Sequence, residues 1–335
     1  MLGCPPPGAR RARTTMSTGP QPKRFPLRLV ALAVIAVAAI VVLVVVLTGG
    51  DDELKVVDEI EVGAAPSAVA VGLGGVWVLN ADGGTMVKVD PDEKKIVGRP
   101  VSIGEAPQFI ALGEGSVWTT AGLGSRVVRV DPGTLRVQKT IIAGFWPTGI
   151  AVGEGAVWVA DTRGDNVTRI DPKTNRKVGR PIKVGRGPQS VVVGGGSVWV
   201  ANFRNDTVSR IDPDTNRVIE TIQTGHGPSY LAFGEGGLWV LNVYDRNLAK
   251  IDTAQNRVVG RPVPLGGTPS GLTTGLGSVW VANTGDAVLQ RIDPDKLAFD
   301  GDPLKLGNHP VGITVDDGSV WVTVAEDNTV VRVEP

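Results

Sequence analysis

The sequence predicts an all-β protein: a seven-bladed β-propeller built from four-stranded blades. The first observation is an internal repeat, because three kinds of residue recur seven times in one register at steps of 40 or 41 residues. The second is composition, since 45 glycines, 24 prolines and only 5% aromatic residues disfavour a mostly helical chain. The recurring residues are the tryptophans Trp77, Trp118, Trp158, Trp199, Trp239, Trp280 and Trp321, the prolines Pro66, Pro107, Pro147, Pro188, Pro228, Pro269 and Pro310, and the acids Asp90, Asp131, Asp171, Asp212, Asp252, Asp293 and Glu334.

Each repeat contains four short apolar runs separated by turn residues, which is the pattern of a small antiparallel sheet. In the repeat that begins at Pro188, the runs span 190–193, 198–201, 208–212 and 217–224. A glycine turn follows the first run, and the Asp-Pro pair at the end of the third favours a type I turn. One such sheet cannot bury both of its faces, whereas seven arranged radially pack face to face as a propeller.

The two ends of the repeat region predict how the ring closes. Residues 55–62 match the fourth run of a repeat, and residues 333–335 come directly after a third run. The N-terminal strand is therefore expected to complete the last blade and to hide strand edges that would otherwise pair with other molecules. The seven tryptophans are expected in the core, opposite small first-strand residues such as Ala70 and Ala151.

An apolar segment precedes the repeats, because residues 29–47 are 19 consecutive residues without a charge or a proline. A helix of this length spans about 30 Å, the thickness of a hydrocarbon core. Basic residues precede the segment and acidic residues follow it, so the positive-inside rule places the N-terminus in the cytoplasm. We expect a disordered cytoplasmic tail at 1–24, a single transmembrane helix acting as a signal anchor at 27–48, and an extracytoplasmic propeller at 49–335.

A cleaved signal peptide is the alternative, and it gives the propeller the same location. Signal peptides have an apolar region of about 7–15 residues and then a small-x-small cleavage site. Here the apolar run is longer, and residues 47–53 offer no convincing site. Translation from Met16 would shorten the tail without changing this argument. The anchor interpretation makes the lipid bilayer a partner through residues 29–47.

Charge and cysteine content exclude several classes of function. Six of the 34 basic residues precede residue 51 and all 34 acidic residues follow residue 50, which leaves 28 basic groups and a formal net charge of −6 beyond that point. Nucleic acid is not an expected partner, because phosphates require a basic face. The single cysteine, Cys4, excludes an intramolecular disulfide and a cysteine-based zinc site. Two histidines in different repeats form no recognisable metal-ligand set, and no cofactor is expected.

Ligand-binding residues are expected where the repeats differ, because whatever recurs in every repeat is most simply structural. The connections between the repeat glycine and the repeat proline differ most, and they lead into first strands, which line the channel of propellers. These connections should share a rim with the loops between second and third strands, where aromatic, basic and imidazole groups would converge on the channel mouth. Loop variation without function is the alternative. The candidate ligand-binding residues, none of them assigned to catalysis, are Phe145, Trp146, Arg186, His226, His309, Gln108, Gln189, Tyr230, Phe203, Arg204, Tyr244 and Arg246.

A basic residue precedes each recurring acid by two positions, as Arg210 precedes Asp212. Residues two apart on a strand share a face, so each basic group is expected beside its acid, as a structural pair or turn support. Because the pattern occurs in all seven repeats, it is not expected to clamp a substrate. Surface pairs of this kind contribute about 0–1 kcal/mol each.

The repeats resemble known propeller families. The Trp-Val-Ala-Asn sequences at 199–202 and 280–283, each followed by a basic-apolar-Asp-Pro turn, resemble the bacterial YVTN repeats with Trp in place of Tyr. The repeats also look like the NHL group, which often forms extracytoplasmic sensors of membrane kinases, but no kinase motif occurs here. The resemblance covers residues 54–335 and implies the fold more than the function, because such propellers bind many things.

Streptogramin B lyase is a further, distant resemblance, also seven-bladed, with repeats that hold a proline followed two residues later by a small residue. The resemblance implies a catalytic histidine directly after a repeat proline and a glutamate three residues after the repeat aromatic. The positions equivalent to the histidine are Ser67, Gln108, Thr148, Gln189, Ser229, Ser270 and Val311. The positions equivalent to the glutamate are Asn80, Ala121, Asp161, Asn202, Asn242, Asn283 and Val324.

Neither the base nor its acidic partner is present at these positions. The sequence therefore favours a membrane-anchored, non-catalytic binding module that takes a protein, peptide, glycan or small solute across one rim. The alternative is a streptogramin-lyase-like or other propeller enzyme with its site at the channel mouth. A histidine clustered with an acid on one rim would favour the enzyme, and the sequence shows no obvious pair of this kind.

Overall fold

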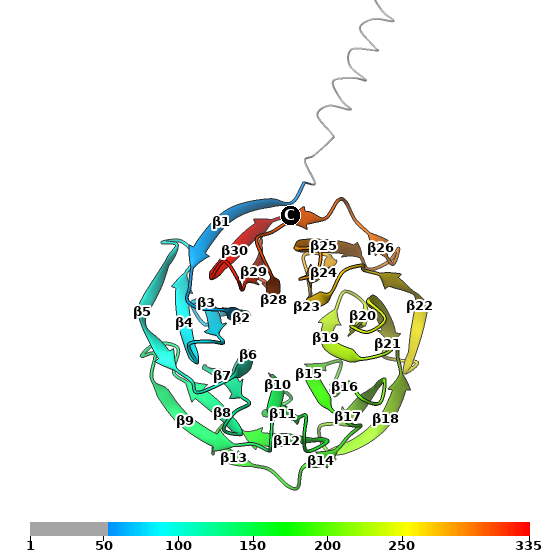
Figure 1. Cartoon of the computed structure of the whole chain (residues 1–335). Coiled ribbons are helices and arrows are strands. Elements are labelled where there is room, and N and C mark those ends of the chain that lie inside the picture. The colour runs from blue at the N-terminus through cyan, green and yellow to red at the C-terminus, as the bar shows by residue number, and fades with distance from the viewer. Residues whose placement is uncertain (1–52) are drawn as a thin grey trace, which may run out of the picture. The chain divides into compact units, whose positions relative to one another are not determined.

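Residues 53–335, the part of the chain that the computed structural model describes, form a ring of seven antiparallel sheets around a central channel (Figure 1). The first strand of each sheet lies at the channel and the fourth lies at the periphery. The predicted all-β, seven-bladed propeller is therefore confirmed. The tail expected at 1–24 and the transmembrane helix expected at 27–48 lie outside the described residues. Within residues 53–335, no helix has the length and apolar character needed to cross a membrane.

The blades follow one another along the chain and are numbered here in that order. Blades 1 and 2 are β2 (Pro66–Gly72), β3 (Gly75–Asn80), β4 (Thr85–Asp90), β5 (Lys95–Ser102) and β6 (Pro107–Gly113), β7 (Ser116–Ala121), β8 (Arg126–Val130), β9 (Val137–Ile142). Blades 3 and 4 are β10 (Pro147–Gly153), β11 (Ala156–Asp161), β12 (Asn166–Asp171), β13 (Arg176–Lys177), β14 (Ile182–Lys183) and β15 (Pro188–Gly194), β16 (Ser197–Asn202), β17 (Thr207–Asp212), β18 (Arg217–Gln223). Blades 5 and 6 are β19 (Pro228–Gly234), β20 (Gly237–Asn242), β21 (Asn247–Asp252), β22 (Arg257–Pro264) and β23 (Pro269–Gly275), β24 (Ser278–Asn283), β25 (Val288–Asp293), β26 (Ala298–Phe299), β27 (Leu304–Lys305). Blade 7 is β28 (Pro310–Val315), β29 (Val320–Val324), β30 (Thr329–Glu334) and β1 (Lys55–Glu61).

The outermost strand is interrupted in blades 3 and 6, where two short strands pair with one third strand. β13 and β14 both pair with β12, and β26 and β27 both pair with β25. Pro181 and Pro303 lie in the two interruptions. Proline has no N–H to donate to the ladder, so it is tolerated only at such edge positions.

The seven repeat tryptophans are the largest fully buried side chains of the described residues, and each is 0% exposed. Each pairs across the first two strands with a smaller residue, as Trp77 with Ala70 and Trp199 with Val192. In blades 1–6 the indole N–H donates to the carbonyl of the glycine that ends the first strand, at 2.9–3.2 Å. The core prediction for these tryptophans is confirmed, and the buried indole N–H is satisfied.

One rim, called the turn rim here, consists of the glycine hairpins between first and second strands and the Asp-Pro turns between third and fourth strands. In six blades the recurring Asp accepts two backbone N–H groups of its own turn, as Asp212 does from Asp214 and Thr215. This confirms turn support as the role of the acid.

The recurring basic residues do not pair with these acids, which corrects the expected ion pairs. In blades 1–5 each cation lies 4.7–5.2 Å from the centroid of its own tryptophan. Each also donates to a turn carbonyl of the next blade, as Arg210 does to Thr253 at 2.9 Å. The shared strand face predicted from spacing holds, but the nearest acceptor belongs to the neighbouring blade. These residues therefore clamp adjacent blades together.

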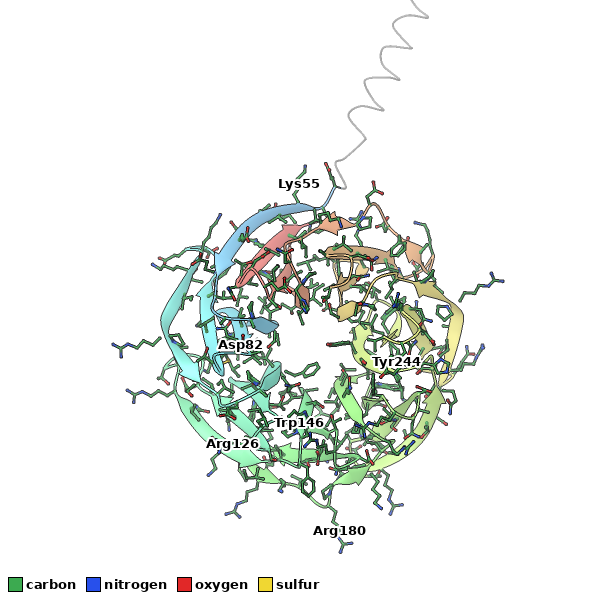
Figure 2. All side chains as sticks on the ribbon, in the orientation of Figure 1. Lys55, Asp82, Arg126, Trp146, Arg180 and Tyr244 are labelled. Atoms are coloured by element: carbon green, nitrogen blue, oxygen red, sulfur yellow. The ribbon has the colours of Figure 1, made fainter. Side chains whose placement is uncertain are left out.

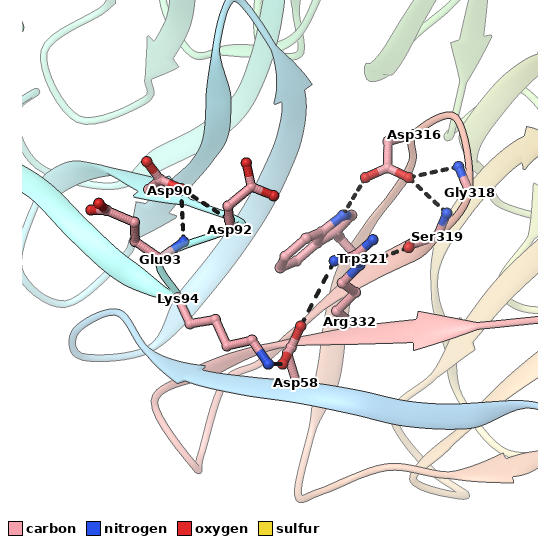
Figure 3. Close-up of polar contacts among 10 residues, drawn as sticks. All are labelled: Asp58, Asp90, Asp92, Glu93, Lys94, Asp316, Gly318, Ser319, Trp321 and Arg332. Carbon is pink, nitrogen blue, oxygen red and sulfur yellow. Dashed lines mark hydrogen bonds and ion pairs between the residues drawn. The ribbon is translucent and has the colours of Figure 1, made fainter.

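The ring closes as predicted, because β1 pairs with β30 along its whole length, from Lys55 opposite Glu334 to Glu61 opposite Thr329. Figure 3 shows the contacts at this seam. Asp58 of β1 is buried and forms ion pairs with both Lys94, in the turn of blade 1, and Arg332 of β30, the latter at 3.8 Å. A carboxylate between two cations thus stands in place of the direct clamp made by the cations of blades 1–5.

Candidate functional site on the variable rim

The opposite rim, called the variable rim here, consists of the connections between blades and the loops between second and third strands. The two sets of segments are joined by backbone hydrogen bonds, including Thr162 N–H to the Trp146 carbonyl and Tyr244 N–H to the His226 carbonyl. Corresponding bonds join Arg204 to Arg186 and Ala325 to His309. The candidate residues of these segments therefore share one rim, as the sequence predicts.

In blade 3, a buried carboxylate holds the two aromatic candidates in place. Asp161, 1% exposed, accepts the backbone N–H groups of Phe145 at 3.0 Å and Trp146 at 2.9 Å. Gly144 has a φ of 124°, and a Cβ there would lie 2.4 Å from the Asp161 carboxylate, so only glycine fits. The Trp146 ring is half-buried, packs against Gly122 and carries the Arg163 guanidinium 4.4 Å from its centroid. Phe145 is 76% exposed.

Blades 4 and 5 bring a second pair of aromatic candidates together. The rings of Phe203 and Tyr244 lie 5.0 Å apart at an interplanar angle of 53°, over the backbone of Gly227. Such tilted contacts stabilise aromatic pairs. The Arg204 side chain packs on Gly187, and the Arg186 N–H donates to Asn205. Figure 2 shows Trp146 below the channel and Tyr244 to the right of it, in different blades.

Each histidine lies beside an acid, which the sequence analysis missed. The Nδ1 atom of His226 is 2.9 Å from Asp245 Oδ1, and its backbone N–H donates to the same carboxylate. The hydrogen bond and the charge of Asp245 raise the pKa of His226. His309 Nδ1 is 3.6 Å from Glu326 Oε1. Both pairs join residues 17–19 positions apart on different segments, so only the recurrence of the hairpin geometry could have revealed them.

The mouth of the channel opens into a cavity of about 380 Å³ near the variable rim. First strands supply nearly all of its lining, which confirms that these strands face the channel, and two candidates, Gln108 and Tyr230, contribute to it. Phe109 and Tyr230 come from opposite parts of the ring and lie 6.1 Å apart across it. Burial raises the pKa of Tyr230. Gln189 is half-buried and does not line this cavity.

The cavity lining contains hydroxyl, amide and apolar groups but no carboxylate, amine, guanidinium or imidazole among the described residues. Several of its hydroxyls are already engaged: Ser270 donates to the Pro310 carbonyl, and Ser190 accepts from the Leu231 N–H. Within residues 53–335, no group of three or more His, Cys, Asp and Glu side chains is placed to hold a metal ion. The cavity therefore suits an uncharged group, and the charges of the site lie on the rim around it.

A sequence model described as the virginiamycin B lyase family matches residues 52–333. The chain belongs to the virginiamycin B lyase family. No curated protein matches the chain. Solved structures of similar fold include virginiamycin B lyase from Staphylococcus aureus, with a TM-score of 0.75 and 18% identity over 84% of this chain and 100% of that one. A streptogramin B lyase structure has a TM-score of 0.73 and 16% identity over 84% and 97% of the two chains.

A similar fold also occurs in a protein that is not named as a lyase, hydrazine synthase from Kuenenia stuttgartiensis. Its structure has a TM-score of 0.71 and 17% identity over 86% of this chain and 98% of that chain. At these identities the likeness establishes the fold alone, because one fold carries many functions. Membership of the virginiamycin B lyase family thus leaves the activity of this chain to be argued from its own residues.

Of the positions equivalent to the lyase histidine, Ser67, Gln108, Ser270 and Val311 line the cavity, whereas the positions equivalent to the lyase glutamate are all buried. Asn80, Asp161, Asn202, Asn242 and Asn283 are all at most 2% exposed. The Asn80 and Asn283 amides donate to the carbonyls of Val62 and Leu265, and Asp161 accepts the N–H groups of Phe145 and Trp146, so these three side chains hold the connections into their own blades. The Asn202 and Asn242 amides donate instead to residues of the third strand of their blades, and none of the five side chains lines the cavity.

Proposed function

We propose that this member of the virginiamycin B lyase family is a non-catalytic binding module that takes its ligand on the variable rim. One observation carries the proposal: the two most exposed large apolar side chains of the described residues, Phe145 at 76% and Tyr244 at 70%, both lie on this rim. Exposed aromatic groups fixed by a rigid scaffold are typical of contact surfaces. The ligand would be a protein, a peptide, a glycan or a small solute that reaches over the channel mouth.

A membrane anchor would display this module outside the cell, with the N-terminus in the cytoplasm. The support comes from the 19-residue apolar run at 29–47 and from the basic residues that precede it. Fractionation tests this part directly: the full chain should remain with membranes after a high-salt wash, and a chain beginning at Asp51 should not. A full chain recovered in soluble form and cut near Thr48 would establish a cleaved signal peptide instead.

The groups that face the channel support a non-catalytic role. Tyr230 is the only titratable side chain that lines the cavity among the described residues, and its raised pKa keeps the phenol neutral. His226 lies on the rim, where Asp245 raises its pKa and so increases the imidazolium fraction near neutral pH. An imidazolium donates hydrogen bonds and cannot accept a proton, which suits recognition better than general-base catalysis.

Capture from the envelope fraction tests the binding role. We expect the full chain, solubilised in neutral detergent, to retain a ligand that is lost when Phe145 and Tyr244 are both replaced with Ala. The control is Phe299→Ala, which removes an exposed aromatic ring from the outer strand β26. A ligand retained equally by all three proteins would contradict the proposal.

A lyase is the second candidate, and the His226–Asp245 pair favours it, because a carboxylate that orients an imidazole is part of many catalytic sites. A catalytically inactive virginiamycin B lyase has been crystallised with quinupristin. Quinupristin incubated with the full chain should remain intact under the binding proposal. Conversion that disappears in a His226→Ala variant would establish the lyase instead.

A further inference from the structure

The arginines of the variable rim gather on one side of the ring. Exposed arginines lie in the loops and connections of blades 2–5 and, in blade 2, at the start of β8, and we call them the arginine arc: Arg126, Arg163, Arg186, Arg204 and Arg246. The four aromatic candidates Phe145, Trp146, Phe203 and Tyr244 belong to the loops and connections of blades 3–5, and Figure 2 labels Trp146 and Tyr244. Aromatic and cationic groups are thus interleaved over about half of the circumference.

The cations of this arc have no anionic partner within the described residues. None of the five arginines forms an ion pair there. The three acids of the same loops are instead engaged by backbone N–H groups: Asp165 accepts from Gly187 at 2.8 Å, Asp206 from Gly227 at 2.9 Å, and Asp245 from His226 at 2.7 Å. The acids therefore hold the connections in place while the guanidinium groups remain available.

The other half of the rim has the opposite sign. Acids project from blades 6, 7 and 1 and from the connection into blade 2, and we call them the acidic arc: Asp286, Glu326, Asp327, Asp82 and Glu105. Lys305 and His309 are basic neighbours of this arc: the Lys305 ammonium donates to the Asp286 carbonyl, and His309 lies beside Glu326. Asp327 accepts the Asn308 backbone N–H, as Asp245 does that of His226. Figure 2 shows Asp82 on one side of the channel and Tyr244 on the other. The rim is therefore polarised across the channel mouth.

We infer that the arginine arc binds a short acidic peptide segment that also carries an aromatic or apolar side chain. The inference rests on the proposed binding role of the variable rim and names the chemistry of its ligand. Carboxylates would pair with the free guanidinium groups, which bind them through two parallel hydrogen bonds. An aromatic or apolar side chain would pack on Phe145 or on the Phe203–Tyr244 pair.

The polarity of the rim favours a peptide over a uniform polyanion. An anionic membrane surface or a long acidic polysaccharide lying across the rim would meet the acidic arc as well and be repelled there. A peptide can change sign along its length, so an acidic segment can lie on the arginine arc while the flanking residues avoid or complement the acids. Arg163 shows how the arc presents its charges, because its guanidinium lies 4.4 Å from the Trp146 ring centroid while the residue remains exposed.

Fluorescence anisotropy of labelled peptides binding to the full chain in neutral detergent tests the inference. The probes are an oligo-glutamate peptide containing one tyrosine, its oligo-lysine counterpart, and labelled polygalacturonate. The test variant replaces Arg163, Arg186 and Arg204 with Gln. The matched control replaces Arg99, Arg180 and Arg261 with Gln, because these arginines are also exposed but lie at the outer edge of the ring: Arg99 in β5, Arg261 in β22 and Arg180 between β13 and β14.

We expect binding of the glutamate peptide, little binding of the lysine peptide, and loss of affinity as ionic strength rises. The test variant should bind about tenfold more weakly, the combined effect of three exposed ion pairs, and the control should bind as the parent does. Equal affinity in the test variant and the control would overturn the inference, as would stronger binding of polygalacturonate. Rim capture that depends on Phe145 and Tyr244 would still stand in either case, so the two proposals fail separately.

Discussion

The two rims of the propeller differ in how far their contacts and exposed side chains repeat from blade to blade. On the turn rim, the same Asp-centred turn recurs in six blades, and the same cation reaches from a tryptophan to the next turn in five of them. On the variable rim the holding contact changes only in part: Asp161 holds the connection of blade 3, whereas the residue six positions after the repeat tryptophan, Asn205, Asp245 or Asp327, accepts the connection N–H in blades 4, 5 and 7. The exposed side chains that these connections carry differ from blade to blade, and it is there that we propose the ligand binds.

The repeated contact between blades needs a turn between the third and fourth strands of the next blade, and blade 7 has no such turn. Blade 7 takes its fourth strand from the other end of the described chain, so it lacks a turn between third and fourth strands. Arg291 of blade 6 therefore pairs with Asp300 of its own blade at 3.0 Å. At the next seam Asp58 links Arg332 to Lys94. The ring thus contains one seam held by a carboxylate in place of the repeated clamp.

The largest expected contrast is between two tryptophans. Trp199→Ala should cost about 3–5 kcal/mol of unfolding free energy, because it leaves a cavity where a fully buried ring packed. Trp146→Ala removes a half-buried ring from the variable rim and should cost about 1 kcal/mol or less. Urea unfolding followed by circular dichroism measures both. Equal losses of unfolding free energy would mean that Trp146 stabilises the fold as much as a core tryptophan does.

The closure seam should be the next most sensitive site. Asp58→Asn removes a buried charge between two cations and should cost about 1–2 kcal/mol, less than a fully buried pair because Lys94 is largely exposed. Glu61→Gln, at an exposed position of the same strand, is the control.

Removal of residues 51–63 should expose the edge of β30 and promote aggregation. If that protein melts as the parent does, the shared blade contributes nothing to stability.

Acid should weaken the contacts of the turn rim. Backbone N–H groups lower the pKa of Asp90 and Asp212, and the Lys296 ammonium together with its turn N–H groups lowers the pKa of Asp293 to about 2. A lowered folded-state pKa gives stability that is present above the unfolded value, near 3.9, and lost as the pH falls through the folded value. The melting temperature should therefore fall between about pH 4 and pH 2. Asp212→Asn should flatten this fall, and an unchanged slope would argue against the turn contacts.

The smallest expected effect lies at His226 and has the opposite sign. Asp245 raises the pKa of this histidine, so the contribution of the pair is complete below the unfolded value, near 6.5, and is lost as the pH rises through the higher folded value. The melting temperature of the parent relative to His226→Gln should decline slightly from pH 6 towards pH 8, a window set by that pKa. A difference that grows with pH would contradict the assigned contact.

The sequence contained nearly all of the fold, because each blade repeats the same buried positions. The step of 40 or 41 residues is enough to predict the buried tryptophans, the Asp-Pro turns and the shared last blade. The hydrogen-bond acceptors of Arg210 and of the equivalent basic residues could not be predicted from this repeat. Strand periodicity gives the face on which a side chain lies, but the acceptor on that face comes from the stacking of the next blade.

The candidate site was predicted in part. The shared rim followed from propeller topology, and the structure places Trp146, Arg186, His226 and His309 there. The pairing of His226 with Asp245 was missed, since the two residues lie 19 positions apart on different segments. The division of the rim into two charged arcs was also missed. It becomes visible only when the loops are arranged around the ring, because charge added up along the chain gives a net of zero.

Site-specific photo-crosslinking in cells tests the central claim, that the variable rim and not the turn rim meets the ligand. A photoreactive phenylalanine analogue would replace Phe145 or Tyr244 on the variable rim, and Leu73 or Leu276, two exposed apolar residues of the hairpins, on the turn rim. We predict adducts from Phe145 and Tyr244 that weaken when Arg186 and Arg204 are replaced with Gln, and none from the leucine positions. Adducts formed from Leu73 and Leu276 but not from Phe145 or Tyr244 would contradict the account.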